Sequence, residues 1–588
     1  MIDCLFEVSF EVCNKVGGIN TVITTKATKA KHLAKEFFLI GPLLPNKEPE
    51  DFSEEIAPHH VIPILASLSS QGIKVKFGRW LIRSEPHVIL VDFSSLWGAK
   101  NDWKRMLWEQ FGIDSYGTGY EFEEPVLFSI ASGKVIEAFS KDNAYLNKKI
   151  VVQTHEWLAG IANLYLKMQK VKVATVFTTH ATMLGRSLSG RGVDLFSALK
   201  TMNPYQAAKD CGVFEKFTTE RACAHHSTQF TTVSDVTAAE AFVVLGRQAI
   251  VTPNGLDSEE YPSFEQVAIK HAASKERLID FSRYFFFPYH QFDLSKTLFY
   301  FMSGRNEFHN KGFDVSIAAL GELNKKLIES GSDRSVVTFV FIATNNNGVR
   351  KDVLMNKLGY RHIKNVIDRI QPQVRAELLD AALSHNKMCI STDLSVELDR
   401  LAKRFRNGMA IAPISTHDLN ENDHPVIGAA KAAGLLNRPT DRVKLVYYPA
   451  YLSGSDELLD MLYLDVVVGC HMGMFLSSYE PWGYTPLESA GLGVPALTTT
   501  CAGFGQFVQK ISAKREGVFV VDRIHKSDRD ITVEVADILM RYSVMNHHDR
   551  VRHKIAAKLI ADTADWALLI KEYEKAYTLA IEAVYGKA

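Results

Sequence analysis

The 588-residue sequence has no excess of charge of either sign, no long apolar run and no basic leader. Lys and Arg number 67, as do Asp and Glu, so no global charge attracts nucleic acid or an anionic membrane surface. Apolar runs such as Val336–Ala343 are much shorter than the roughly 20 residues of a membrane-spanning helix. The first residues lack the basic region of a signal peptide. We therefore expect a cytoplasmic protein with no nucleic-acid partner and no membrane partner.

Cysteine is scarce, and several common catalytic motifs are missing. The seven cysteines include no CxxC pair, which argues against a zinc ribbon and against a disulfide framework. Cysteines beside apolar residues are typical of buried thiols in a reducing compartment. The HExxH motif, the Walker A loop and the G-x-S-x-G nucleophile elbow are also absent. We expect no metal cofactor.

Short apolar runs alternate with longer amphipathic stretches through most of the chain. The runs are rich in Val, Ile, Phe and Thr, a pattern typical of parallel strands covered by helices on both faces. The sequence therefore predicts an α/β fold. Its expected strands are Ile2–Phe10, Phe37–Ile40, His87–Val91, Lys149–Gln153, Ala174–Thr178, Phe230–Val233, Ala249–Thr252, Thr297–Met302, Val336–Ala343, Val443–Tyr448, Gly473–Leu476, Ala496–Thr500 and Gly517–Val521.

A segment without a strand pattern, Pro262–Lys296, divides the alternation into two halves. We expect two Rossmann-like domains that face each other across a cleft, formed by residues 1–275 and 276–555. Apolar residues from Lys558 to Val584 form one wide helical stripe. Residues 556–588 are therefore expected to form a C-terminal helix that packs back on the domains.

Residues 345–407 interrupt the second half with a long polar segment of helical composition. Within it, apolar residues recur at three- and four-residue spacing with Arg and Lys between them. Such a helical insertion is either a solvated flap or an assembly surface, and we favour assembly.

Three short motifs follow expected strands of the first half. Lys15 precedes Gly17 and Gly18, whose amides and following helix could bind an anion, although such a pair is also an ordinary tight turn. His155 and His180 lie in the loops THEWLAG and TTHATMLGR. Ligands of open α/β sheets gather at the carboxyl ends of strands. A lone histidine there often satisfies only backbone groups, but two on one edge favour a ligand site.

The loop Ser303–Gly312, with the sequence SGRNEFHNKG, follows the first strand of the second half. Arg305 and Lys311 lie six residues apart in it. Arg offers a two-pronged donor and Lys a point charge, so the pair suits a diphosphate. A solvated surface pair is the alternative.

The segment Ser477–Gly505 contains two carboxylates, Glu480 and Glu488, with seven residues between them. Thr485 and Glu488 have the spacing of an N-cap and its N3 partner, so a capping box is one role for Glu488. The loop that precedes this helix start predicts, in addition, a site for an anion and for hydroxyl groups.

Seven segments together resemble glycogen synthases of the animal and fungal type, in the same order over Leu5–Phe507. They are Glu7–Thr25, FTTHATMLGR, FTTVSDVTAAEA, VTPNGL, GRNEFHNKGFD, DRVKLVYYPAYL and GCHMGMFLSSYEPWGYTPLES. The resemblance implies a retaining glycosyltransferase of the GT-B arrangement. It would transfer glucose from UDP-glucose to the non-reducing end of glycogen or another α-1,4-glucan. It would need no metal and would form a homotetramer through the helical insertion.

The resemblance also implies roles for residues of the second domain. Arg305 and Lys311 match the pair that holds the donor pyrophosphate and stabilises the UDP leaving group. Glu480 matches the carboxylate beside the transferred glucose, and Glu488 the one on the donor ribose. Tyr463 aligns with an aromatic residue that stacks on uracil. The expected glucose- and phosphate-binding segment contains Trp482, Gly483, Tyr484 and Thr485.

In the first domain, His180 and Arg186 match residues that close onto the donor sugar, with His180 counted among the catalytic residues. Lys15, Gly17 and Gly18 match the phosphate loop. The family has an arginine-rich helix that binds glucose 6-phosphate, and the corresponding stretch here, Met540–Lys554, carries a thinner cationic cluster. Activation by a sugar phosphate stays open at this point.

Two other functions fit the same residues. One is a different retaining GT-B glycosyltransferase, which would use another nucleotide-glucose or a small acceptor. The other is a catalytically silent subunit that binds a sugar nucleotide or a glucan.

In a glycosyltransferase, departure of the leaving group places negative charge on the diphosphate and positive charge on the sugar ring. Cations must then neutralise the diphosphate, and a carboxylate stabilises the ring.

Overall fold

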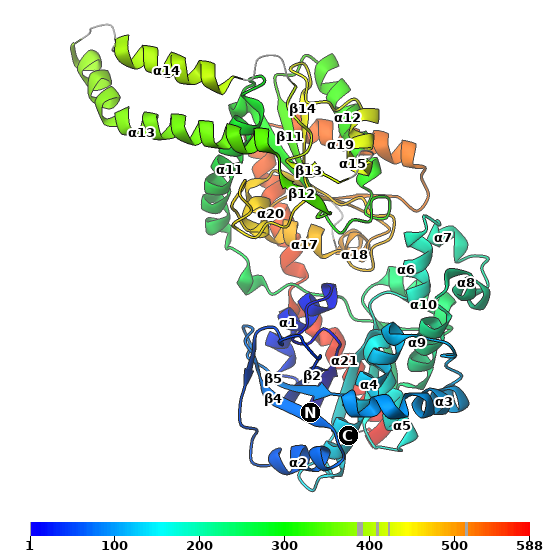
Figure 1. Cartoon of the computed structure of the whole chain (residues 1–588). Coiled ribbons are helices and arrows are strands. Elements are labelled where there is room, and N and C mark those ends of the chain that lie inside the picture. Colours follow the sequence, from blue (N-terminus) through cyan, green and yellow to red (C-terminus); the bar gives the residue numbers. More distant parts are fainter. Residues whose placement is uncertain (1, 385–391, 407–410, 421–423, 512–515, 588) are drawn as a thin grey trace.

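The computed structural model describes residues 2–384, 392–406, 411–420, 424–511 and 516–587. They form two α/β units, the first below the second in Figure 1, each built around a sheet of mainly parallel strands. The two units confirm the predicted fold class.

The sheet of the first unit has nine strands in the order β3-β4-β5-β2-β1-β6-β7-β8-β9. All seven strands expected in this half are present, and β4 runs antiparallel to its neighbours β3 and β5 at one edge. The edge strands β3 and β4 were not predicted. The strands are β1 Ile2–Val8, β2 Ala34–Pro42, β3 Phe52–Glu54, β4 Lys74–Trp80, β5 His87–Asp92, β6 Ile150–His155, β7 Ala174–Thr179, β8 Gln229–Thr232 and β9 Ile250–Val251.

Helices cover both faces of this sheet. Along β1, Phe6 and Val8 join the apolar core beneath α4 and α5, whereas Leu5 joins the core beneath α1 and α21. Both faces are thus buried, as expected for parallel strands. The helices are α1 Gly18–Ala30, α2 Ile62–Ser70, α3 Lys100–Phe111, α4 Tyr120–Lys141, α5 Glu156–Met168, α6 Met183–Gly190, α7 Leu195–Ala198, α8 Pro204–Cys211, α9 Phe214–His226, α10 Asp235–Leu245 and α21 Trp566–Tyr585.

The sheet of the second unit has six parallel strands in the order β14-β11-β10-β15-β16-β17. All six were predicted, whereas the small antiparallel pair β12 Asn346–Val349 and β13 His417–Leu419 was not. The strands are β10 Thr297–Ser303, β11 Ser335–Phe341, β14 Val443–Tyr448, β15 Met472–Met474, β16 Ala496–Thr499 and β17 Val518–Val521.

The helices of the second unit include one that crosses the expected domain boundary. Helix α11 runs through residue 275 and packs on α16 and α13 of the second unit. The division at residue 275 itself stays a proposal. The helices are α11 Phe264–Phe286, α12 Phe313–Glu329, α15 Pro425–Ala432, α16 Tyr463–Gly469, α17 Tyr484–Gly491, α18 Gly503–Ile511, α19 Asp528–Val544 and α20 His547–Thr563.

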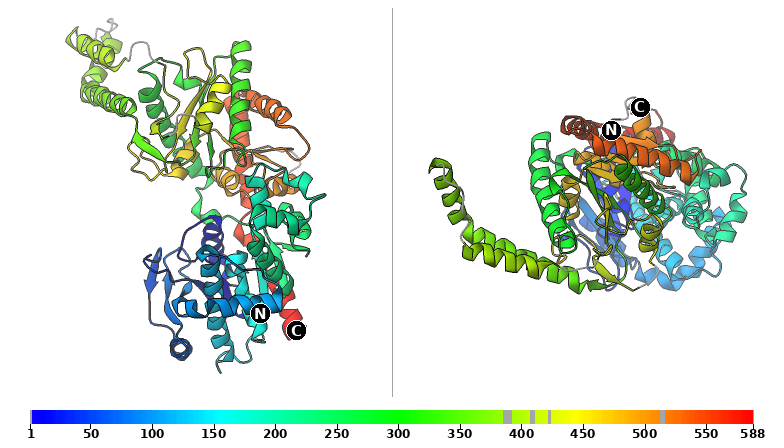
Figure 2. Two further views of the ribbon diagram at one scale, coloured as in Figure 1. Left: turned by 45° about the vertical axis from the view of Figure 1, so that its right-hand side comes forward. Right: turned by 90° about the horizontal axis from the view of Figure 1, so that it is seen from above.

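The expected insertion forms two long helices, α13 Lys351–Ser384 and α14 Thr392–Phe405. Figures 1 and 2 show them extending away from the rest of the molecule. They place apolar side chains in solvent, among them Met355, Leu358, Leu378, Leu379, Leu383 and Val396.

A C-terminal helix that packs on the first unit is present as α21, but it begins at Trp566 and not at residue 556, because the residues up to Thr563 belong to α20. The Asp565 side chain caps α21, and the chain crosses there from one unit to the other. Trp566 N–H donates to Leu256 O (3.0 Å), and Leu256 N–H donates to Ala564 O (2.8 Å). The two connections between the units therefore bind each other. Helix α20 packs on α17, and α21 packs on α1 and the first sheet.

None of the helices in the described part of the chain is both long enough and apolar enough to cross a membrane.

Candidate functional site

The candidate site lies where the carboxyl ends of central strands of both sheets meet. From the first unit come loops that follow β1, β6 and β7, and from the second unit come loops that follow β10 and β15. The units touch directly, because Ser189 Oγ of α6 donates to Asn310 Oδ1 at 2.6 Å. The hydroxyl of Tyr484 also lies 3.3 Å from the carbonyl oxygen of Gly255. Residues far apart in the chain therefore form one site.

Lys311 and Glu480, both predicted site residues, are in direct contact. The Lys311 ammonium group donates to Glu480 Oε2, and both side chains are mostly buried. Gly312, with φ of +69°, ends the loop and starts α12 directly after Lys311. The backbone N–H of Glu480 donates to Cys501 O at 3.1 Å, and its C=O accepts from Gly503 N–H at 3.0 Å. Both partners of the ion pair are thus held by short, fixed backbone segments.

Three cations converge on one carboxylate, Glu307. Arg305 lies 2.9 Å from Glu307 Oε1, and Asn310 Nδ2 donates to its other oxygen at 2.7 Å. Partial burial acts to raise the pKa of Glu307, but the Asn310 hydrogen bond and the charges of Arg305, Lys311 and Arg186 lower it. These charges come from both units. The site therefore brings the predicted residues Arg305, Lys311 and Arg186 together.

Helix α17 begins earlier than predicted. Its N-cap is Gly483, with φ of +108°, and no side chain caps it. Thr485 is thus the second residue of the helix and Glu488 the fifth, so the expected capping box is wrong. The glycine reverses the chain by adopting a left-handed conformation that other residues rarely adopt, which starts the helix before Thr485.

Glu488 is therefore free of the capping role and lies near two tyrosines. Burial raises its pKa to about 7, and the charge of Lys15, from the first unit, acts to lower it. Burial raises the pKa of Tyr261 and of Tyr463, and the charge of Glu488 raises both further, so both side chains lie near Glu488. The hydroxyl of Tyr463 lies 2.7 Å from Ser303 Oγ. These half-buried residues bring hydroxyl and carboxylate groups close together.

In the first unit, three buried carboxylates hold the loop that carries His180. Glu156 accepts from His180 N–H at 2.8 Å, Glu240 accepts from Thr182 N–H at 3.1 Å, and Glu220 accepts from Met183 N–H at 3.0 Å. Burial raises the pKa of Glu156 and of Glu240 to about 7 in each case. The loop is thus fixed by side chains that sequence reasoning did not select.

Arg186, on α6, is the cation of this region. Arg186 is accessible to solvent, and the charges that act on it include Tyr479 and Glu307 of the second unit. The surrounding protein displaces water from the guanidinium and acts to lower its pKa, but proximity to Glu156, Tyr479 and Glu307 raises it. Arg186 therefore links the carboxylates of the first unit to the loop that carries Arg305 and Lys311.

The expected phosphate loop is already occupied by a side chain of the protein. Glu11 Oε2 accepts from Gly17 N–H at 2.8 Å and from Asn20 N–H at 2.9 Å. Helix α1 starts at Gly18, and Lys15 is exposed beside it. The structure therefore offers the Lys15 charge to a ligand, whereas Glu11 satisfies the amide of Gly17. Glu11 lies four residues before Lys15, and nothing in the sequence around it predicts that it binds the Gly17 amide.

Trp482, also predicted to bind substrate, lies in the apolar core. Its side chain is 4% exposed and packs against Phe504 and Phe507, with ring centroids 6.1 and 5.7 Å away. Its role in the described structure is thus to pack the loop between Glu480 and Gly483.

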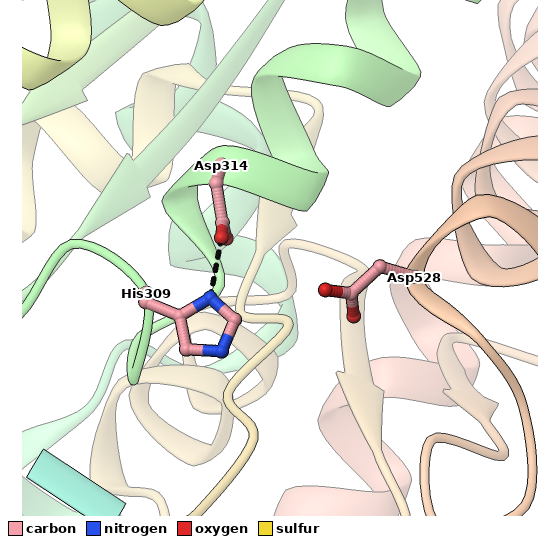
Figure 3. Close-up of side chains that lie close together, drawn as sticks. All are labelled: His309, Asp314 and Asp528. Atoms are coloured by element: carbon pink, nitrogen blue, oxygen red, sulfur yellow. Dashed lines mark hydrogen bonds and ion pairs between the residues drawn. The ribbon is translucent and has the colours of Figure 1, made fainter. Parts of the chain in front are cut away.

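One cluster of metal-ligating side chains occurs close to this loop (Figure 3). His309, Asp314 and Asp528 place one ligand atom each within 4.8 Å of one another. His309 Nδ1 already binds Asp314 Oδ2 at 2.6 Å, and Asp528 pairs with Arg523 at 3.1 Å. The cluster is open to solvent, and its carboxylates have partners within the protein.

A cavity of about 710 Å³ lies in the second unit between α11 and α20. Of the described residues that line it, none is acidic, whereas Lys275, Arg334, Arg550, Lys554 and Lys558 are basic. Burial and the charge of Lys275 lower the pKa of Lys554 to about 7. The cavity also contains three histidines, which are His271, His471 and His547. Such a lining suits an anion.

Comparison with known proteins adds an independent observation. The family model described as glycogen synthase matches residues 7–588. Glycogen [starch] synthase isoform 2 of Saccharomyces cerevisiae is 34% identical over 99% of this chain and 86% of the yeast protein. The liver glycogen [starch] synthase of Homo sapiens is 34% identical over 99% of this chain and 84% of the human protein.

A solved structure shares the arrangement of the two units. The catalytic domain of starch synthase IV from Arabidopsis thaliana, bound to ADP and acarbose, matches with a TM-score of 0.54. The two chains are 12% identical, and the match covers 99% of each. At this identity the likeness concerns the fold alone.

Proposed function

This chain belongs to the glycogen synthase family, and we propose that it transfers glucose from UDP-glucose to the non-reducing end of an α-1,4-glucan, with retention. The observation that carries the proposal is the contact between Lys311 and Glu480, with Arg305 and Arg186 beside it. One cationic group and one carboxylate are thus positioned together, as the two developing charges of the reaction require.

The proposed division of roles follows from the positions of the charges. Lys311 and Arg305 neutralise the departing diphosphate, and Glu480 stabilises positive charge on the sugar ring. In the structure, Lys311 and Glu480 neutralise each other. When the donor binds, the ammonium group exchanges part of this contact for the phosphate oxygens. No metal is needed in this scheme, because the cations of the protein supply the positive charge.

The remaining predicted residues bind the two ends of the donor. Glu488, Tyr463 and Ser303 form the pocket for the nucleoside, where a carboxylate and hydroxyl groups meet ribose and an aromatic ring meets the base. His180 and Arg186 approach the glucose from the first unit. Gly483, Tyr484 and Thr485 contribute backbone at the start of α17.

The test is transfer of labelled glucose to glycogen by the full chain. UDP-, ADP-, GDP- and TDP-glucose are supplied in parallel, with glycogen or with small glucosides as acceptors. We expect label in the polymer with UDP-glucose. Label only in a small acceptor would favour the alternative glycosyltransferase, and donor binding without transfer or hydrolysis would favour a silent subunit.

We propose that the protein is cytoplasmic and forms a homotetramer through α13 and α14. These helices extend into solvent and expose Leu378, Leu379 and Leu383. Apolar side chains on such a projection are stabilised by burial against another copy.

We further propose that a sugar phosphate binds the cationic cavity between α11 and α20 and regulates activity. Lys275, Arg550 and Lys554 would bind the phosphate, and the 710 Å³ volume has room for a hexose. Glucose 6-phosphate should then raise activity more than inorganic phosphate or glucose does. Because Lys554 has a pKa of about 7, the effect should weaken as the pH rises above 7. An equal response of wild type and Lys554→Ala would contradict this assignment.

A further inference from the structure

A buried series of charged and polar groups runs from helix α1 to His180. Lys26 of α1 and Glu7 of β1 have fully buried side chains, and Lys26 Nζ lies 2.7 Å from Glu7 Oε1. His155 Nε2 lies 2.7 Å from the same oxygen. His155 Nδ1 lies 2.9 Å from His180 Nε2. The proposed mechanism uses only the last member of this series.

Lys26 and Glu7 determine which ring nitrogen of His155 carries the proton. Lys26 only donates, and an ionised Glu7 only accepts. Burial acts to raise the pKa of Glu7, but Lys26 and His155 lower it to about 2, so Glu7 is ionised. His155 Nε2 must therefore carry the proton that it shares with Glu7.

The charge state of His155 decides the rest. Burial lowers the pKa of His155, and the nearby Lys26 charge acts in the same direction, against the opposing effect of Glu7. A neutral His155 with a proton on Nε2 has a bare Nδ1, which accepts from His180 Nε2–H. Burial also lowers the pKa of His180, so its Nδ1 is bare as well.

The exposed end of the series faces the site. Of the described residues, none forms a hydrogen bond with His180 Nδ1. The ring is 7% exposed, in the loop that also carries Arg186. A ligand hydroxyl is a suitable donor to this nitrogen.

Helix α21 holds the other end of the series in place. Gln153 Oε1 accepts from Lys26 Nζ at 3.0 Å and from the hydroxyl of Tyr577. Lys26 Nζ also lies 4.5 Å from the centroid of the Tyr573 ring. The buried ammonium group thus has partners on three sides, which fixes its position.

We propose that Lys26, Glu7 and His155 are positioning residues that hold His180 with a proton on Nε2 and a bare Nδ1, which accepts a hydrogen bond from a donor-glucose hydroxyl. The inference rests on the proposed donor site for the identity of the hydroxyl. The tautomer of His180 follows from the protein alone.

Removal of the Lys26 charge should reverse the direction of the hydrogen bond between His155 and His180. In Lys26→Met, the charge of Glu7 is no longer neutralised by the ammonium group, so His155 takes up a proton and donates from both nitrogens. His180 Nε2 then accepts, and His180 Nδ1 carries a proton. The residue that meets the substrate would change from an acceptor to a donor without itself being altered.

The first measurement is the tautomer of His180 in the ligand-free, full-length protein labelled with ¹⁵N-histidine. Protonated and bare imidazole nitrogens give separate NMR resonances, and His180→Phe assigns the signals by their loss. We expect a bare Nδ1 in the wild type and a protonated Nδ1 in Lys26→Met. Lys31→Met, which removes an exposed charge at the end of the same helix, is the matched control and should match the wild type. A protonated Nδ1 in the wild type would overturn the proposal, even if Lys26→Met does not fold.

The second measurement is binding of UDP-glucose analogues in which hydrogen or fluorine replaces one hydroxyl at a time. Fluorine cannot donate a hydrogen bond. At the position that His180 contacts, both analogues should therefore bind the wild type about tenfold more weakly or worse. In Lys26→Met the fluoro analogue should bind better than the deoxy analogue. If the fluoro analogue already binds the wild type as well as UDP-glucose at every position, His180 does not accept. A failure of UDP-glucose itself to bind would count against the proposed function and leave the tautomer result standing.

Discussion

Lys311 shows what a single charged side chain contributes at this site. It follows β10 by one loop, precedes the left-handed Gly312, and contacts Glu480 from another loop of the same unit. A flexible lysine is thus held in a fixed position. In the proposed reaction the diphosphate leaves beside this lysine, so its charge would face more negative charge in the transition state than in the ground state, which is the condition for catalysis.

Replacement of Lys311 by alanine should lower kcat at least about 100-fold, because one lost contact to the leaving group removes about 3 kcal/mol of transition-state stabilisation. The measurement is initial rate with UDP-glucose and glycogen. Lys325→Ala is the matched control, since Lys325 lies on α12 and pairs with Glu322 on the exposed face of that helix. Near-normal turnover of Lys311→Ala would remove Lys311 from the mechanism.

The buried Glu240 makes stability depend on pH. Burial raises its pKa from 4.5 to about 7, against the hydrogen bonds from Thr182. Between these values the folded state keeps a proton that the unfolded state loses, so stability falls as the pH rises. Glu240→Gln should remove this effect. The free energy of unfolding of Glu240→Gln, taken relative to that of the wild type, should therefore increase by about 2 to 3 kcal/mol from pH 5 to pH 8.

Denaturant titrations at both pH values test this expectation for Glu240→Gln. Glu109→Gln changes an exposed carboxylate on α3 in the same way and should follow the wild type at each pH. A pH-independent difference between Glu240→Gln and the wild type would show that Glu240 is ionised throughout.

At the scale of elements, the start of α17 depends on a backbone conformation. Gly483 has φ of +108°, and an added Cβ would lie 3.3 Å from Pro486 Cγ and 3.4 Å from Glu480 Cγ. The glycine therefore both starts the helix and leaves room for the Glu480 side chain. An apolar stripe or a capping pattern in the sequence does not reveal such a requirement.

Gly483→Ala should destabilise the protein by about 1 to 3 kcal/mol through backbone strain and should displace Glu480. We expect a lower melting temperature and a lower kcat. Gly428→Ala, within α15, meets no atom within 4 Å and should leave both quantities close to wild type. Unchanged kcat in Gly483→Ala would mean that the loop tolerates the shift and that Glu480 does not need this position.

At the scale of the whole molecule, α13 and α14 form a projection that is packed at its base and exposed beyond it. Tyr360 and Lys364 of α13 bind Asp280 of α11, whereas Leu378, Leu379 and Leu383 further along α13 are exposed. Figure 2 shows that the two helices project from the second unit in both views. The two connections between the units, by contrast, are bound to each other at Leu256 and Trp566. Because α13 and α14 belong to the second unit and lie away from these connections, association through them would leave the two units free to move relative to each other when a ligand binds.

The double substitution Leu378→Asp and Leu379→Asp should convert a tetramer into smaller species, because a buried charge in an apolar interface is strongly unfavourable. Light scattering at micromolar concentration measures the mass. Ile269→Asp, an exposed change on α11, is the control and should leave the mass unchanged. A wild-type monomer would contradict the proposed assembly.

Periodicity in the sequence determined the fold class and the thirteen expected strands, because buried parallel strands require continuous apolar runs. The contact between Lys311 and Glu480 came from the tertiary structure. Only the tertiary structure decided the start of α17, the break between α20 and α21, and the occupation of the Gly17 amide by Glu11. It alone also brought Lys26, Glu7, His155 and His180 into one series. Those contacts join residues up to 148 positions apart in the chain, so their geometry depends on how strands pair and helices pack, which no local pattern records.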